Sequence, residues 1–274
     1  MNETKRLSTV YGPVRSWRLG MSLGIDLLNI DSICSFDCVY CQLGRIRRVT
    51  AERGLFVSTE QVIRDLGAAG PPPVDAVTFS GNGEPTLALN LGDAIEALRE
   101  RVDAPIVVLT NSTLLGDAAV RQDLMAADRV FCKLDAVSND ALRRIDRPAI
   151  NMDVDEIAEN IRRFRKEFPG QLAIQTMLLT KPDTAWIERY IKLVGMIGPD
   201  EIQLNIPSRP VPTEWMPENR GNHGPRPADY RRLGHPGASE MEAIAAAIRA
   251  GTGIPVLLPP AARSAQEDPN LVNA

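Results

Sequence analysis

The chain has 274 residues, of which 44% are apolar and 24% are charged. That balance is typical of a globular protein with a sizeable core, and it excludes a disordered chain, a collagen-like chain and a small disulfide scaffold. The formal net charge of −4 disfavours a nonspecific nucleic-acid binder, which would be strongly basic. No apolar run approaches the roughly 20 residues that a membrane span needs, so we expect no membrane contact.

The cysteine content and the polar start of the chain bear on the compartment. Residues 1–11 lack the apolar stretch of a signal peptide. The chain has four cysteines, and without an export signal they indicate a reducing compartment where thiols stay free or bind metal. We therefore expect a cytoplasmic protein.

Apolar and amphipathic segments alternate along the chain. Six apolar segments are predicted to be strands, and they cover residues 23–28, 74–79, 106–109, 129–134, 172–179 and 201–206. The helices predicted between them cover residues 58–66, 91–101, 153–168 and 183–196. This alternation favours right-handed βαβ units and a parallel sheet. Because six repeats are too few for the closed eight-fold barrel, we predict an α/β fold, a partial (β/α)6 open barrel with a C-terminal loop-rich extension.

Composition divides the chain into four regions. We expect an N-terminal extension over 1–20, the barrel core over 21–206, a loop with a C-terminal helix and strand over 207–258, and a disordered tail over 259–274. Residues 207–237 contain seven prolines and four glycines, a composition typical of a lid, a binding loop or a linker. The helix is predicted at 239–249 and the strand at 254–258.

Three of the four cysteines lie within eight residues. Cys34, Cys38 and Cys41 form a C-x3-C-x2-C run directly after the first predicted strand. Loops at the carboxyl ends of parallel strands carry the active sites of α/β proteins. Three thiolates can hold three irons of a 4Fe–4S cubane, and the fourth iron is then free to bind another molecule.

Zinc is the alternative to iron at these cysteines. Zinc would need a fourth ligand and prefers two close pairs, whereas only Cys38 and Cys41 form such a pair. The remaining candidates, Cys132, His223 and His235, are far away in sequence. Cys132 lies in the middle of an apolar strand, where we expect a thiol packed in the core.

The cysteine run resembles the signature of the radical S-adenosylmethionine (SAM) superfamily, with Tyr40 just before the third cysteine. The turn Ser80-Gly-Asn-Gly-Glu84-Pro is similar to the superfamily's Gly-Gly-Glu-Pro motif. The resemblance implies a 4Fe–4S cluster held by Cys34, Cys38 and Cys41, with SAM chelating the open iron. One electron then cleaves the sulfonium and gives a 5′-deoxyadenosyl radical that abstracts a hydrogen atom.

The resemblance also assigns the SAM-binding residues. Glycine lets the backbone approach SAM, and the Glu84 carboxylate suits its cationic amino group. Lys133 and Asp135 lie on one face of their strand, where a structural ion pair is the alternative. The residues assigned to cofactor binding are Tyr40, Ser80, Gly81, Asn82, Gly83, Glu84, Asn111, Lys133, Asp135, Gln175 and Asn205. No catalytic residue is assigned.

Residues 11–44 and 205–210 resemble iron–sulfur oxidoreductases related to the wybutosine-synthesis enzyme of tRNA. That enzyme carries a second cluster, which Cys132 alone could not anchor. The chain also has no room for a flavodoxin domain, so we expect an external one-electron reductant of the flavodoxin or ferredoxin type.

Arginines in two segments suggest the substrate. They are Arg15, Arg18, Arg45, Arg47 and Arg48 near the cysteines, and Arg209, Arg220, Arg226, Arg231 and Arg232 in the Pro/Gly-rich region. If they converge, the substrate is anionic, either a phosphate-bearing small molecule or a tRNA loop. The alternative function is an iron–sulfur protein for electron transfer or redox sensing without SAM chemistry, which would not need the Glu84 and Asn111 motifs.

Overall fold

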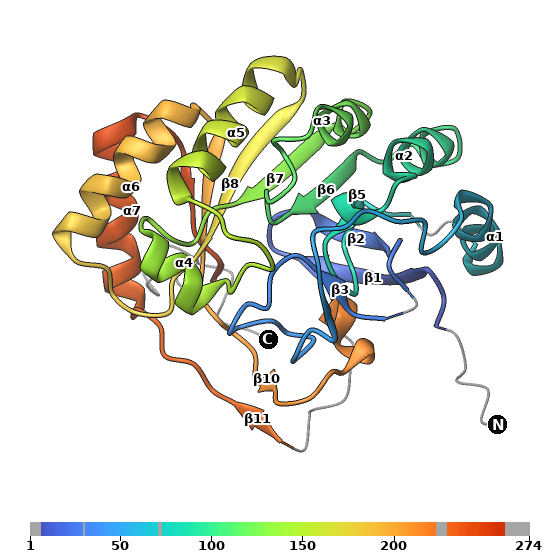
Figure 1. Ribbon diagram of the computed structural model, residues 1–274, viewed down its shortest axis with the longest axis horizontal. Coiled ribbons are helices and arrows are strands. Elements are labelled where there is room, and N and C mark those ends of the chain that lie inside the picture. Colours follow the sequence, from blue (N-terminus) through green and yellow to red (C-terminus); the bar gives the residue numbers. More distant parts are fainter. Residues whose placement is uncertain (1–6, 30, 71–72, 223–228, 261–274) are drawn as a thin grey trace.

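The computed structural model describes residues 7–29, 31–70, 73–222 and 229–260. An eight-stranded sheet with strand order β1-β2-β5-β6-β7-β8-β9-β12 curls into a half-barrel (Figure 1). Its strands are β1 Val10–Ser16, β2 Gly20–Ile25, β5 Ala76–Phe79, β6 Ile106–Thr110, β7 Arg129–Lys133, β8 Gln171–Met177, β9 Glu201–Asn205 and β12 Val256–Leu257. The predicted α/β partial barrel is confirmed.

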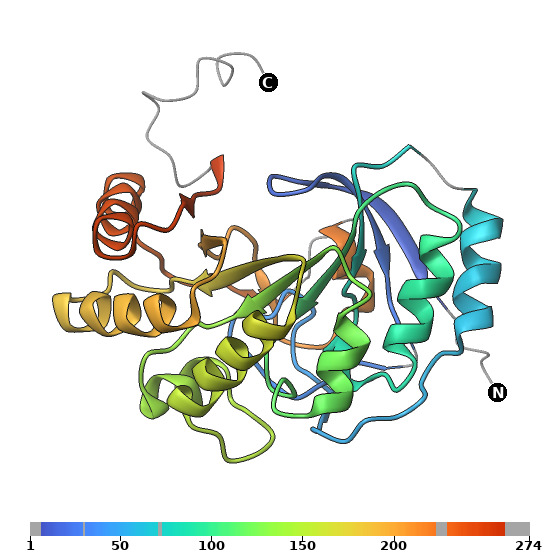
Figure 2. The ribbon, with the colours of Figure 1, turned by 90° about the horizontal axis from the view of Figure 1, so that it is seen from above.

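Within this sheet, the strands from β2 to β12 run parallel, and the edge strand β1 pairs antiparallel with β2. The helices follow the outer side of the sheet as an arc (Figure 2). They are α1 Thr59–Ala69, α2 Leu91–Arg99, α3 Ala118–Leu124, α4 Asn139–Ile145, α5 Val154–Glu167, α6 Thr184–Ile197 and α7 Ala238–Thr252. These seven helices lie in the six crossovers between parallel strands, as right-handed βαβ units require.

Alternation along the strands separates the core from the barrel interior. In β7, Val130 and Cys132 belong to the large cluster under the helices, whereas Phe131 belongs to a small cluster on the opposite face. The helices supply their apolar stripe to the large cluster, as Ile161 and Phe164 of α5 do. The same alternation directs Lys133 toward the barrel interior, because it lies two residues after Phe131.

The N-terminal part differs from the sequence-based expectation. Residues 10–16 were expected in an extension outside the core, but they form β1 and pair with β2. A register shift between Tyr11 and Val14 interrupts the alternating pattern that would have indicated a strand. The predicted strand at 23–28 is β2, which ends earlier because the chain turns at Asp26, whose carboxylate accepts the backbone N–H of Leu28 at 2.9 Å.

The Pro/Gly-rich region crosses the open side of the half-barrel. It contains β10 Val211–Pro212, the 3-10 helix η2 Pro217–Asn222 and β11 Tyr230–Arg231. Arg220 of η2 is buried and donates to Asp26 at 2.8 Å, to Asn29 at 2.6 Å and to the backbone carbonyl of Ser8 at 2.5 Å. We refer to residues 207–222 as the strap, which these contacts fasten to the barrel. From residue 261 on, the expected tail lies outside the described residues.

In the described part of the chain, no helix is long and apolar enough to cross a membrane.

The ion pair between Arg220 and Asp26 generates a stability prediction. The substitution Arg220→Ala would leave the carboxylate of Asp26 buried without its cation, and we expect unfolding to become easier by about 3–5 kcal/mol. Urea denaturation followed by circular dichroism measures this change. The matched control is Arg231→Ala, an exposed arginine that should cost less than about 0.5 kcal/mol. Equal effects of the two substitutions would contradict a structural role for the pair.

Candidate functional site

The cysteine loop lies at the carboxyl edge of the sheet, directly after β2. Cys34 ends the short strand β3, Ile33–Cys34, which pairs with β4, Arg48–Val49. The loop is also bonded to the end of α4, because the N–H of Asp37 donates to the carbonyl of Asp146 at 3.0 Å. These main-chain bonds fix the segment that carries Cys34, Cys38 and Cys41.

Hydrogen-bond donors surround the cysteine sulfurs. The ammonium of Lys133 lies 2.8 Å from Cys38 Sγ, and the amide nitrogen of Asn111 lies 3.6 Å from Cys34 Sγ. Burial raises the pKa of the Cys34 thiol to about 12, and it also raises the pKa values of Cys38 and Cys41. Thiolates in so dry a place need a neighbouring cation, and a bound metal is one that would supply it.

The donor set fits a cubane with one open iron. Within the described residues, no three Cys, His, Asp or Glu side chains converge to hold a single metal ion, whereas a cubane binds each thiolate to a different iron. Cys132 is buried under the helices, as predicted, and faces away from the loop. His235 is exposed and lies next to the carbonyl of Pro236. Neither can supply the fourth ligand that zinc prefers, and His223 lies outside the described residues.

The glycine-rich turn is bonded directly to the cysteine strand. The N–H of Ile33 donates to the carbonyl of Asn82 at 3.0 Å, and the N–H of Glu84 donates to the carbonyl of Ile33 at 3.1 Å. A Cβ at Gly83 would lie only 1.6 Å from that carbonyl oxygen, so only glycine fits. Gly81 adopts a φ of +126° beside Asp26, which again favours glycine.

The carboxylate of Glu84 is hydrogen-bonded within the protein. The side chain is 2% exposed and accepts hydrogen bonds from the Thr86 N–H at 3.1 Å, the Thr110 hydroxyl at 2.7 Å and the Asn111 N–H at 2.6 Å. Burial raises the pKa of Glu84, and these donors oppose that rise. Glu84 therefore holds the end of β6 against the turn, and a direct contact with SAM would compete with these hydrogen bonds.

Lys133 is the centre of a charged network next to the cysteines. Its ammonium lies 3.3 Å from Asp135 and 3.4 Å from Asp146, and the hydroxyl of Tyr40 donates to Asp135. Burial alone would lower the pKa of Lys133, but Cys38, Tyr40 and the two carboxylates raise it. Burial, with Asp135 nearby, raises the pKa of Asp146 to about 8. The predicted pair of Lys133 and Asp135 thus exists, and it touches Cys38 through Lys133.

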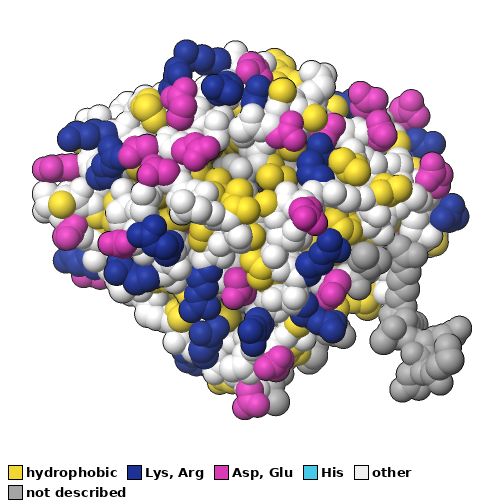
Figure 3. Space-filling view, in the orientation of Figure 1, with side chains coloured by type: hydrophobic (Ala, Val, Ile, Leu, Met, Phe, Trp, Pro, Cys, Tyr) yellow, Lys and Arg dark blue, Asp and Glu magenta, His cyan; other side chains and the backbone are white. Residues whose placement is uncertain are grey.

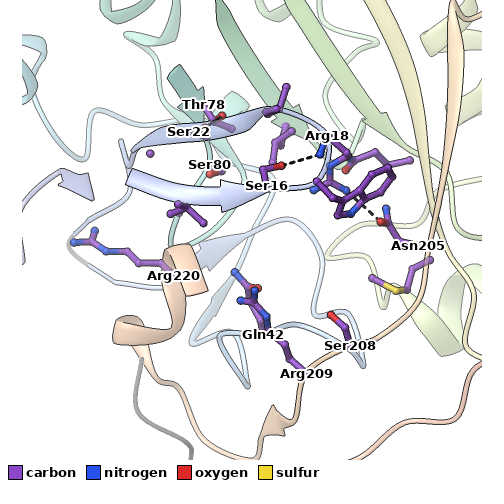
Figure 4. A pocket seen from close by; sticks show the side chains of 18 of the residues that line it. Ser16, Arg18, Ser22, Gln42, Thr78, Ser80, Asn205, Ser208, Arg209 and Arg220 are labelled. Atoms are coloured by element: carbon purple, nitrogen blue, oxygen red, sulfur yellow. Dashed lines mark hydrogen bonds between the residues drawn. The ribbon is translucent and has the colours of Figure 1, made fainter. Parts of the chain in front are cut away.

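A cavity of about 450 Å³ opens beside the cysteine loop, between the β1–β2 hairpin and the strap (Figure 4). Ser80 lies in it and shares a hydrogen bond of 2.6 Å with the Tyr11 hydroxyl. Gln175 donates to Gln203 at 2.8 Å, which satisfies part of the hydrogen-bonding capacity of the buried Gln203 amide. The predicted residues that line this cavity are Tyr40, Ser80, Gly81, Gly83, Gln175 and Asn205.

The other predicted residues do not line this cavity. Asn82 and Glu84 are buried under the turn, and Asn111, Lys133 and Asp135 lie on the cysteine side. Two nearby polar residues lie away from the site. Thr176 does not face the barrel interior, because its hydroxyl bonds to Tyr190 of α6 at 2.6 Å. Arg143 is exposed and pairs with Asp140.

Sequence reasoning missed two members of the site. Asp146 contacts Lys133 although it follows α4, and no motif marked it. Tyr11 reaches Ser80 from β1, a strand that the sequence pattern did not indicate. Both depend on contacts between distant segments, which a local pattern does not encode.

Comparisons with known proteins agree with this geometry. The chain matches the radical SAM superfamily over residues 28–194. It is 43% identical over 265 residues to a UPF0026 protein of Synechocystis sp., covering 95% of this chain and 98% of that protein. A UPF0026 protein of Methanocaldococcus jannaschii is 37% identical over 216 residues, covering 77% of this chain and 67% of that protein.

These relatives correct one expectation from the sequence. They are UPF0026 proteins and not wybutosine-synthesis enzymes, so the predicted closeness to the latter is wrong. The motifs that suggested this closeness belong to the cysteine loop and the β1–β2 hairpin. These segments say little about the substrate.

Solved structures share the fold. A radical SAM methyltransferase from Sphaerobacter thermophilus has a TM-score of 0.56 at 17% identity, covering 87% of this chain and 65% of that chain. The structure of anSMEcpe with bound AdoMet has a TM-score of 0.51 at 14% identity, covering 86% and 63%. At these identities the likeness concerns the fold alone. The cysteine loop, the glycine-rich turn and the close relatives together assign this chain to the radical SAM superfamily, as a UPF0026 protein.

Proposed function

We propose that the protein holds a 4Fe–4S cluster through Cys34, Cys38 and Cys41 and cleaves SAM reductively to generate a 5′-deoxyadenosyl radical for use on an anionic substrate. The observation that carries this proposal is the position of the three thiols. They lie beside a cavity lined by Tyr40 and the glycine-rich turn, and no fourth cysteine and no histidine lies near them among the described residues. When bound, the cluster supplies the electron and one open iron for SAM.

The chain's own residues prepare this site. Lys133 and Asn111 place donors on the sulfurs of Cys38 and Cys34, and hydrogen bonds to sulfur tune a cluster's potential. Gly81 and Gly83 let the main chain of the cavity wall pack closely against Asp26 and Ile33, where a Cβ would collide. The strap covers the open side of the barrel and limits the access of water.

An electron carrier is the competing function. Such a protein would commonly supply four ligands to its cluster and would have no use for a cavity beside it. The cavity of about 450 Å³ and the three-thiol loop therefore favour SAM chemistry.

The reductant would be a separate acidic protein of the flavodoxin or ferredoxin type. Arg45, Arg48 and Arg144 are exposed around the cysteine loop and the end of α4, and in the described residues none of them has an acidic partner. In Figure 3, Lys and Arg side chains gather over the lower middle of the face, where Figure 1 shows these segments. We name the surface of these three residues the arginine face. A basic surface next to the cluster would steer an acidic donor to it.

The proposed function predicts that the protein cleaves SAM. Anaerobic reconstitution with iron and sulfide, followed by dithionite and SAM, should release 5′-deoxyadenosine, which chromatography quantifies. The substitution Cys38→Ala should reduce both bound iron and this release to background, because the remaining two thiols cannot retain the cluster.

The matched control is Cys132→Ala. Its thiol is buried under the helices, so this variant should lose about 1 kcal/mol of stability and keep bound iron and product release. An iron-loaded protein that never releases 5′-deoxyadenosine would refute the proposed function and favour an electron carrier. Zinc in place of iron after purification would also refute it.

Docking of the reductant at the arginine face is also testable. The double substitution Arg48→Glu and Arg144→Glu should slow product release driven by reduced flavodoxin about tenfold or more at low salt, because charge steering is lost. The loss with dithionite as reductant should be much smaller. The matched control, Arg231→Glu, reverses a charge on β11 and should change neither rate appreciably. Equal losses with both reductants would place the effect on the cluster and contradict docking at this face.

A further inference from the structure

The cavity beside the cysteines has an unbalanced charge. Four arginines line it, namely Arg15, Arg18, Arg209 and Arg220, and the described residues of its wall include no aspartate or glutamate. Arg220 is neutralised by Asp26 at 2.8 Å. The other three form no ion pair with any carboxylate in the described part of the chain. The empty cavity therefore carries excess positive charge.

Arg18 is the most buried of the three unpaired arginines. It lies in the turn of the hairpin, over the ring of Trp17, and donates to Asn205 at 3.2 Å from one terminal nitrogen. Its Nε is buried and, among the described residues, has no hydrogen-bond partner. Glu201 exerts a charge effect on it without contact and accepts instead from Gln203 at 2.5 Å. Figure 4 shows Arg18 beside Asn205 at the edge of the cavity.

A partly buried guanidinium whose Nε lacks a hydrogen-bond partner is costly unless a ligand completes its bonds. Burial lowers the pKa of Arg18 to about 10, because its charge is poorly solvated. The fork of Nε and the terminal nitrogens matches two oxygens of a carboxylate or phosphate. Arg209 lies on the strap across the same cavity, and burial lowers its pKa too.

Most of the other arginines considered above point elsewhere. Arg45 and Arg47 line a separate groove with Trp215, and Arg47 stacks on its ring. Arg231 is exposed on β11. SAM cannot balance the remaining charge, since it carries a sulfonium and an ammonium group against a single carboxylate and is itself cationic. A second, anionic ligand of the cavity would supply the missing negative charge.

We propose that Arg18, assisted by Arg209, binds an oxyanion of the substrate, a carboxylate or a phosphate, at the hairpin side of the cavity. The inference rests on the proposed function, because it concerns the substrate of the same site. It favours a small anionic molecule over an RNA loop, since Arg18 lines a cavity of about 450 Å³ and its Nε is buried.

The test is isothermal titration calorimetry with inorganic phosphate and with acetate as probes. The protein is the anaerobically reconstituted holoenzyme with saturating SAM, at constant ionic strength. We expect one ion to bind per chain. Tighter phosphate binding would indicate a phosphate-bearing substrate, and tighter acetate binding would indicate a carboxylate. Arg18→Gln should weaken binding about tenfold or more, because it removes a charge-assisted pair of hydrogen bonds.

Two further variants separate the site from a general charge effect. Arg209→Gln should weaken binding several-fold and tests the proposal even if Arg18→Gln fails to fold. Arg231→Gln is the matched control and should change the affinity less than twofold. Binding of neither ion, or unchanged affinity in both Arg18→Gln and Arg209→Gln, would overturn the proposal.

The effect of SAM on ion binding shows whether Arg18 binds the carboxylate of SAM or an oxyanion of the substrate. If saturating SAM abolishes ion binding that is present without it, Arg18 serves the carboxylate of SAM and the inference is wrong. Ion binding at Arg18 without any 5′-deoxyadenosine release would refute only the proposed function. Release of 5′-deoxyadenosine without ion binding would refute only this inference.

Discussion

The cysteine strand and the glycine-rich turn are joined main chain to main chain, through the two hydrogen bonds between Ile33 and residues 82 and 84. This approach is possible because Gly83 has no Cβ, which would otherwise collide with the carbonyl of Ile33. The cysteine loop and the wall of the cavity are therefore one unit. Their relative position is set by backbone geometry and not by flexible side chains.

Glu84 extends the same unit to a third strand. Its buried carboxylate accepts from Thr110 and from the N–H of Asn111, and Asn111 in turn donates to Ser35 at 2.8 Å, next to Cys34. Motifs from β5 and β6 are thus linked to the cysteine loop by hydrogen bonds within a dry interior, where each bond is expensive to break. The motif residues that do not line the cavity have this supporting role.

Charged side chains in the interior are paired with carboxylates at two places and lack a carboxylate partner at a third. Arg220 and Asp26 neutralise each other and fasten the strap, and Lys133 is enclosed by two carboxylates beside Cys38. Arg18, whose Nε is buried, has no carboxylate partner among the described residues. Buried charges are normally paired, because desolvation is costly. The exception lies in the cavity, where a ligand can complete the pair.

The sequence by itself determined the parallel half-barrel and the three-thiol loop, and it marked Tyr40, Ser80 and Gly83, which line the cavity, because strand periodicity and motif spacing are local properties of the chain. Only the tertiary structure decided that residues 10–16 are a strand of the sheet, that Thr176 faces α6, and that Asp146 completes the network of Lys133. It also separated Arg18 from the arginines on the surface. Burial and charge pairing depend on which distant segments meet, and no local pattern records that meeting.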